Sequence, residues 1–227
     1  LERADRCVTI TPGDPLAGRG VAVPGDISSA AFLLVGAAIA SGSDLTIRDV
    51  GVNPTRTGVI EILRLMGAEV DLGRVREPAG EPVADVRVRP APLKGVTIPP
   101  DLVPAAIDEF PALFVAAACA SGETRLSGAR ELRVKESDRI QVMAEGLAEL
   151  GVAAEPTEDG IRITGGRLKG GEVDSHGDHR VAMAFAVAAL RADGPVTVRD
   201  CRNVDTSFPG FVELAASCGL GIERREA

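Results

Sequence analysis

The stretch ALFVAAACASG at residues 112–122 decides the fold, because two similar stretches occur elsewhere in the chain. They are AAFLLVGAAIASG at residues 30–42 and AMAFAVAALRADG at residues 182–194. Each is an Ala-rich apolar run that ends in glycine, a residue that commonly closes helices because it adopts the left-handed conformation without strain. A short run containing β-branched residues follows each stretch. The chain is therefore predicted to contain three copies of one unit that begins with an apolar helix.

Each copy continues with a second helical pattern, which closes at Gly67, Gly151 and Gly219. A strand is predicted after each of these helices, and the strands begin at residues 69, 152 and 221. Alternating apolar residues predict further half-buried strands at residues 83–88 and 161–163. The sequence therefore predicts an α/β (α+β) fold of three pseudosymmetric βαβαββ-like units packed around a shared core.

The units are expected at about residues 24–100, 101–173 and 174–227, and together they form one domain. Residues 1–23 lie outside the repeats and are interpreted as a strand and linker that come from a missing N-terminal half. The chain begins at Leu1, without Met and directly in strand-like sequence, which indicates a fragment or a trimmed chain.

The composition is that of a soluble globular protein, with 45% hydrophobic and 26% charged residues. A net charge of −8 argues against nucleic acid and anionic membrane as partners. No apolar run reaches the roughly 18 residues that a membrane span needs. The four cysteines form no C-x-x-C pair, so we expect free, buried thiols in a reducing cytoplasm. Two histidines without a cysteine cluster give no metal site.

The most informative motif is RVKESDR at residues 133–139, which precedes the second helix of the second unit. Lys135 and Arg139 are four residues apart and are predicted to share a helical face. Two cations at the positive end of a helix are unfavourable unless an anion binds there. The alternative is a solvated helix start at which Glu136 or Asp138 neutralises Arg139.

Two other helix starts carry candidate groups. Asp178 is a plausible N-cap, and His179 and Arg180 follow it in the first turn, where a cation again calls for an anion. His179 either packs against the fold or takes part in catalysis. Asp108 either caps the next apolar helix or serves as a general base near Lys135. If all six helix starts face one way, as the pseudosymmetry suggests, they would hold a polyanionic ligand.

Six motifs together resemble EPSP synthase (3-phosphoshikimate 1-carboxyvinyltransferase), in the order of that family and over nearly the whole chain. They are PGDISSAAF, NPTRTG, IDEFP, RVKESDR, GDHRVAM and TSFP. The IDEFP, NPTRTG and TSFP wording resembles the bacterial class II subgroup, which is associated with glyphosate tolerance. Related transferases acting on UDP-N-acetylglucosamine share the fold but have no KESDR equivalent. The resemblance implies one domain of the enolpyruvyl transferase inside-out barrel.

The resemblance also implies the reaction, in which the enolpyruvyl group of phosphoenolpyruvate moves to the 5-hydroxyl of shikimate 3-phosphate and phosphate is released. Asp108 matches the general base that takes the proton of the hydroxyl. Lys135 matches the lysine that contacts this hydroxyl and relays protons. The reaction belongs to aromatic amino acid biosynthesis and needs neither a metal nor an organic cofactor.

Four further positions match residues of the phosphoenolpyruvate side. Glu136 matches the carboxylate that protonates the methylene group, and Arg139 and Arg180 match arginines that bind phosphoenolpyruvate. His179 matches the histidine beside them. Glu131 stands where other members carry an asparagine, and Thr206 stands where they carry a lysine.

Family members have two such domains, with the site between them, so the N-terminal domain is an expected partner and the chain alone is expected to be inactive. Two alternatives remain open from the sequence. One is enolpyruvyl transfer to UDP-N-acetylglucosamine, and the other is a non-catalytic half-domain that binds small anions.

Overall fold

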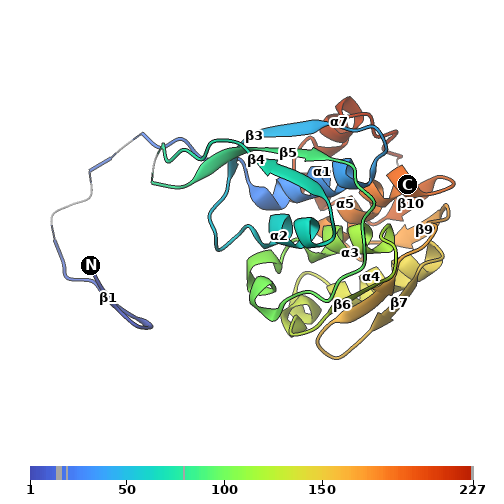
Figure 1. The fold of residues 1–227 in the computed structure, drawn as a ribbon, viewed down its shortest axis with the longest axis horizontal. Coiled ribbons are helices and arrows are strands. Elements are labelled where there is room, and N and C mark those ends of the chain that lie inside the picture. The colour runs from blue at the N-terminus through green and yellow to red at the C-terminus, as the bar shows by residue number, and fades with distance from the viewer. Residues whose placement is uncertain (14–16, 19, 79, 226–227) are drawn as a thin grey trace.

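Three apolar helices occupy the centre of the fold (Figure 1). They are α1 (Ile27–Ile39), α3 (Phe110–Ala118) and α5 (His179–Ala188), and each packs against the other two. Every residue of α3 is buried, as expected for a helix that is apolar on all sides. The computed structural model describes residues 1–13, 17–18, 20–78 and 80–225.

The first two units have the same topology. In both, a three-stranded antiparallel sheet places the last strand of the unit between the other two. The first unit contains β3 (Leu45–Gly51), α2 (Gly58–Leu65), β4 (Glu69–Leu72) and β5 (Val83–Arg89). The second contains β6 (Glu123–Leu126), α4 (Arg139–Glu149), β7 (Ala153–Pro156) and β8 (Ile161–Thr164). The short 3-10 helices η1 (Pro100–Leu102) and η2 (Pro104–Ala106) lie between β5 and α3, and η3 (Arg130–Val134) lies between β6 and α4.

The third unit departs from this plan. Its strand β9 (Gly171–Asp174) pairs in parallel with β10 (Val196–Arg199), and Val196 lies opposite Gly171. After α5 the chain forms η4 (Ala189–Arg191), and after β10 it forms α6 (Val204–Ser207) and α7 (Phe211–Ser217). The strand predicted at residues 221–222 is wrong, because these residues have no regular structure. In the first two units that strand pairs with a later strand, and no strand follows residue 222 among the described residues, which end at residue 225.

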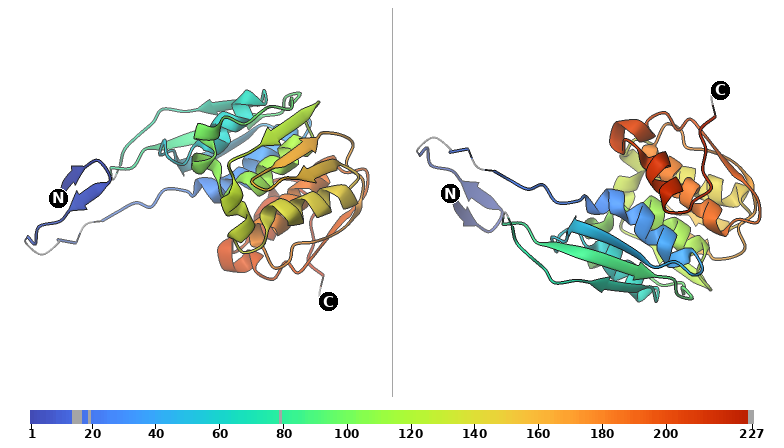
Figure 2. Two further views of the ribbon diagram at one scale, coloured as in Figure 1. Left: turned by 90° about the horizontal axis from the view of Figure 1, so that it is seen from below. Right: turned by 90° about the horizontal axis from the view of Figure 1, so that it is seen from above.

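The N-terminal segment stands apart from these units. Strands β1 (Glu2–Ala4) and β2 (Cys7–Thr9) form an antiparallel hairpin in which every residue is exposed. Figures 1 and 2 show the hairpin away from the helices and sheets of the three units. Residues 14–16 and 19 of the predicted linker lie outside the described residues.

The cysteines are free, as predicted, but their predicted burial is wrong for three of the four. Cys7 lies in the exposed hairpin, Cys201 in a loop, and Cys218 on the solvent side of the end of α7. Only Cys119 is largely enclosed, and burial raises the pKa of its thiol to about 11. Among the described residues, no helix has the length and apolar character that would let it traverse a bilayer.

Candidate active site

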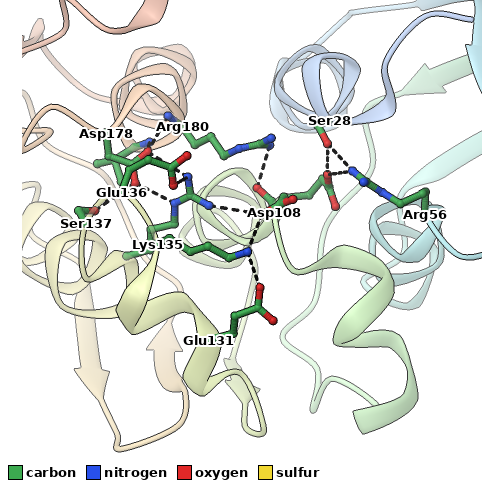
Figure 3. A network of polar contacts seen from close by, with 12 residues as sticks. Ser28, Arg56, Asp108, Glu131, Lys135, Glu136, Ser137, Asp178 and Arg180 are labelled. Atoms are coloured by element: carbon green, nitrogen blue, oxygen red, sulfur yellow. Dashed lines mark hydrogen bonds and ion pairs between the residues drawn. The ribbon is translucent and has the colours of Figure 1, made fainter. Parts of the chain in front are cut away.

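Asp108 lies at the centre of a cluster of charged side chains at the start of α3 (Figure 3). Its Oδ1 is 3.3 Å from the Nζ of Lys135 and 3.6 Å from the Nη1 of Arg139. The alternative that Asp108 caps α3 is wrong, because Glu109 occupies the N-cap position and no side chain caps this helix. The carboxylate of Asp108 is therefore directed at cations rather than at backbone N–H groups.

Lys135 and Arg139 meet at Asp108 by a different route from the predicted one. The predicted helical face is wrong, because Lys135 has an extended backbone and α4 begins only at Arg139. Asp138 fixes that start by accepting a hydrogen bond from the backbone N–H of Gln141 at 3.0 Å. The turn between the two cations then brings both side chains to the same carboxylate.

Arg139 is buried and joins the starts of α4 and α5. Its Nε donates to Asp178 Oδ2 at 2.8 Å, and its Nη2 donates to Glu136 Oε2 at 2.5 Å. Asp178 is fully buried, accepts from the Ser137 hydroxyl, and caps α5 through the backbone N–H groups of residues 180 and 181, as predicted. The Nη1 of Arg139 is buried without a hydrogen-bond partner among the described residues, so one donor remains open toward Asp108.

Arg180 and His179 complete the cluster from the first turn of α5. The Nη1 of Arg180 donates to the backbone oxygen of Asp108 at 3.1 Å. His179 is half-buried, and burial lowers the pKa of its imidazole although Asp178 acts in the opposite sense. His179 is the first residue of α5, directly before Arg180.

The charges fix the protonation states of Asp108 and Lys135. Burial alone would raise the pKa of Asp108, but the charges of Arg180 and Lys135 outweigh burial and lower it. The pKa of Lys135 is raised, first by its hydrogen bond to Glu131 and then by Asp108. At neutral pH the pair is therefore a carboxylate and an ammonium, and Glu131 is a second partner of Lys135.

A second set of contacts was not predicted from the sequence. The hydroxyl of Ser28 donates to the buried carboxylate of Glu109, and Arg56 donates to Ser28 Oγ at 2.8 Å. Ser28, Arg56 and Glu109 lie within three of the motifs quoted from the sequence, PGDISSAAF, NPTRTG and IDEFP, but no role in these contacts was predicted for any of them. The only available signal was a glutamate directly before an apolar helix.

The predicted convergence of all six helix starts is incomplete. The starts of α1, α3, α4 and α5, and the segment before α2, supply side chains to these contacts. The start of α6 does not, since Asp205 pairs with Arg224 at 2.6 Å. Two surface hollows, of about 460 and 510 Å³, lie elsewhere, between α4 and β9 and beside Cys119. In the part of the chain that the structure describes, no three His, Cys, Asp or Glu side chains are arranged to hold a metal ion.

Asp178→Asn is expected to make stability less sensitive to acid. Burial would raise the pKa of Asp178, but its contacts with Arg139 outweigh burial and lower the pKa below the usual 3.8. A carboxylate with a lowered folded-state pKa contributes stability that is complete above the unfolded-state pKa and is lost as the pH falls through the folded-state pKa. The unfolding free energy of the original chain should therefore fall more steeply than that of the variant between about pH 4 and pH 2.

Urea denaturation at several pH values measures this difference. The matched control is Asp193→Asn, because Asp193 pairs with an exposed arginine, Arg167. Equal pH slopes for the original chain and Asp178→Asn would contradict the prediction.

Comparison with known proteins gives the family. The family model described as EPSP synthase (3-phosphoshikimate 1-carboxyvinyltransferase) matches residues 2–214. The 3-phosphoshikimate 1-carboxyvinyltransferase of Alkalilimnicola ehrlichii is 65% identical over 228 residues, which cover 100% of this chain and 51% of that protein. The enzyme of that name from Halorhodospira halophila is 67% identical over 217 residues, covering 95% and 49%. The chain thus spans about half the length of the curated relatives it matches.

Solved structures agree with this result. EPSP synthase from Acinetobacter baumannii superimposes with a TM-score of 0.92 at 55% identity, covering 94% of this chain and 50% of that one. The enolpyruvyl transferase NikO from Streptomyces tendae gives a TM-score of 0.72 at 20% identity, over 91% of this chain and 46% of its own length, and shows the fold alone. The predicted α/β fold of an enolpyruvyl transferase domain is confirmed. By its sequence and its fold, this chain belongs to the EPSP synthase (3-phosphoshikimate 1-carboxyvinyltransferase) family.

Proposed function

We propose that this chain is half of an enzyme that transfers the enolpyruvyl group of phosphoenolpyruvate to the 5-hydroxyl of shikimate 3-phosphate. The observation that carries the proposal is the meeting of Lys135, Arg139 and Arg180 at Asp108, in a member of this family. The products are 5-enolpyruvylshikimate 3-phosphate and inorganic phosphate. The exposed free thiols suit a reducing compartment such as the cytoplasm.

Arg139 and Arg180 are the proposed ligands of phosphoenolpyruvate. Guanidinium groups pair well with phosphate and carboxylate, because their donors match two oxygens at once. The open Nη1 of Arg139 is buried, and a buried donor without a partner costs free energy. A bound anion would supply the missing acceptor. His179, with its lowered pKa, would border the same anion as a neutral ring.

Asp108 is the proposed general base. It removes the proton of the 5-hydroxyl while the hydroxyl oxygen forms a bond to C2 of phosphoenolpyruvate. A carboxylate with a lowered pKa is a weak base, but substrate anions beside Lys135 and Arg180 would offset the cationic charge and raise the pKa of Asp108. Lys135, 3.3 Å away, is placed to contact the hydroxyl and to relay the proton.

Glu136 is the proposed acid. It is a carboxylate in its ion pair with Arg139, so its half-exposed side chain takes up one proton from solvent before it donates that proton to the substrate. Its side chain is about half exposed beside Arg139, at the rim of the cluster. Protonation of the methylene carbon turns it into a methyl group and gives a tetrahedral intermediate. Loss of phosphate, with removal of one methyl proton, then restores the double bond. Fixed cations would stabilise the negative charge on the departing phosphate.

The charge balance of the cluster explains why the other half is needed. The cluster contains three cations and four carboxylates, so its net formal charge is −1. The cations are Lys135, Arg139 and Arg180, and the carboxylates are Asp108, Glu131, Glu136 and Asp178. Two phosphorylated substrates cannot be held by this balance alone. We therefore propose that the N-terminal half supplies further cations, and that this chain alone is inactive.

The test combines the chain with the first half of the Alkalilimnicola ehrlichii relative and measures phosphate release from phosphoenolpyruvate. We expect release with shikimate 3-phosphate, none with UDP-N-acetylglucosamine, and none from either half alone. Halves that bind each other but release no phosphate with shikimate 3-phosphate would overturn the proposal. Phosphate release by this chain alone would overturn the proposal that the chain depends on the other half.

A further inference from the structure

Glu109 is a buried carboxylate next to the proposed base, and the proposed reaction does not use it. Its side chain is 1% exposed. It accepts a hydrogen bond from the Ser28 hydroxyl at the start of α1, and it lies 3.4 Å from the Nη2 of Arg56, just before α2. Buried carboxylates are rare unless they are paired, so this group has a specific reason to be there.

Asp108 and Glu109 are neighbours whose side chains contact different units of the fold. Asp108 pairs with Lys135 of the second unit and accepts from Arg180 of the third through its backbone oxygen. Among the described residues, the partners of the Glu109 side chain are Ser28 and Arg56, which both belong to the first unit. This dipeptide therefore makes polar contacts with all three units.

The carboxylate of Asp108 is held less firmly by its partners than the carboxylate of Glu109 is held by Ser28 and Arg56. Lys135 is a flexible side chain that Glu131 also engages, and the Asp108–Arg139 separation of 3.6 Å exceeds a hydrogen bond. No side chain caps α3, and the backbone at residues 108–109 is held by other hydrogen bonds, from Arg180 to the Asp108 oxygen at 3.1 Å and from the Glu109 N–H to the Ala106 oxygen at 3.0 Å. The contacts of Glu109 with Ser28 are enclosed, and enclosed polar contacts are strong because the local dielectric is low.

We propose that Glu109, held by Ser28 and Arg56, is a positioning residue that sets where the carboxylate of Asp108 stands. The proposal rests on the function proposed above, in which Asp108 is the general base. Glu109 acts through Asp108 and does not touch a substrate. Glu109 contacts Ser28 and Arg56, and burial raises the pKa of its carboxyl against the effect of both contacts.

Kinetics of the two assembled halves give the first test. Glu109→Ala removes both anchors and should lower kcat by about 10- to 100-fold, since a shift of about 1 Å at a reacting group can have that effect. Glu109→Gln keeps an oxygen that can accept from Ser28 and Arg56, and it should retain most of the activity. In an Asp108→Asn background, Glu109→Ala should have little further effect, because coupled residues are not additive.

A purely structural role would give a different pattern. It would lower the melting temperature of Glu109→Ala without changing kcat at temperatures where the variant is folded, or it would lower kcat by the same factor in the Asp108→Asn background. Either result overturns the proposal. Glu149→Ala, an exposed position near the end of α4, is the control.

The pKa of Asp108, measured by carboxyl-carbon NMR in this chain alone, gives a test that does not depend on turnover. Glu109→Ala and Glu109→Gln remove the same negative charge, so a difference in the pKa of Asp108 between the two variants reports a change in the position of Asp108. The pKa of Asp108 should be higher in the alanine variant, because Asp108 then moves away from its cations. Equal values in both variants would overturn the positioning role. Absence of turnover in the unaltered assembled halves, with unequal values here, would overturn only the proposed function.

Discussion

Asp108→Asn should lower the turnover of the assembled halves by about 10²- to 10⁴-fold, the usual contribution of a general base. Asparagine has nearly the same shape as aspartate, so the packing at the start of α3 should persist. It cannot take up the proton of the 5-hydroxyl. Loss of the base should therefore lower kcat more than it changes the Michaelis constant for phosphoenolpyruvate, because Arg139 and Arg180 are the residues proposed to bind that substrate.

Asp101→Asn is the matched control for this change. Asp101 lies in η1, seven positions earlier in the same segment, and its side chain is exposed. It should leave phosphate release unchanged. If Asp108→Asn were no slower than this control, Asp108 would not be the base.

Arg139→Ala should reduce the free energy of unfolding by about 3–5 kcal/mol, as expected when one partner of a buried ion pair is removed. Asp178 is fully buried and would lose its cationic partner, the Nε of Arg139 at 2.8 Å. It would keep the Ser137 hydroxyl and the backbone N–H groups that it caps. Urea denaturation of the chain at pH 7 measures the loss.

Two further variants separate the buried charge from other causes. Arg162→Ala breaks the exposed pair with Glu155, and should cost no more than about 1 kcal/mol. Arg139→Met combined with Asp178→Asn removes both charges, so its loss should be smaller than that of Arg139→Ala alone. A loss for Arg139→Ala as small as that of Arg162→Ala would mean that the buried pair does not stabilise the fold.

The repeat was predictable because it depends on local patterns. Apolar stretches that end in glycine identified α1, α3 and α5, since a helix that is apolar on all sides has to be buried. Alternation identified β5 and β8 because side chains on a strand alternate between two faces. The missing strand at residues 221–222 shows the limit of this reasoning. A strand needs a partner, and which partner is present is a property of the whole fold.

The members of the candidate site were predictable, but their geometry was not. The sequence indicated Lys135, Arg139 and Arg180 because cations at a helix start need an anion. It could not show that Asp178 is the buried partner of Arg139, since that contact joins residues 39 positions apart. The sequence also did not indicate which unit the Glu109 side chain contacts, because the turn before α3 directs neighbouring side chains to different units.

The central claim is that Arg139 and Arg180 bind phosphoenolpyruvate beside Asp108. NMR of the assembled halves, with ¹⁵N-arginine only in this chain, tests it most directly. On addition of phosphoenolpyruvate, the guanidinium signals of Arg139 and Arg180 should shift with a common saturation curve, while that of exposed Arg162 should not. Saturable binding that leaves the Arg139 and Arg180 signals unmoved would contradict the account.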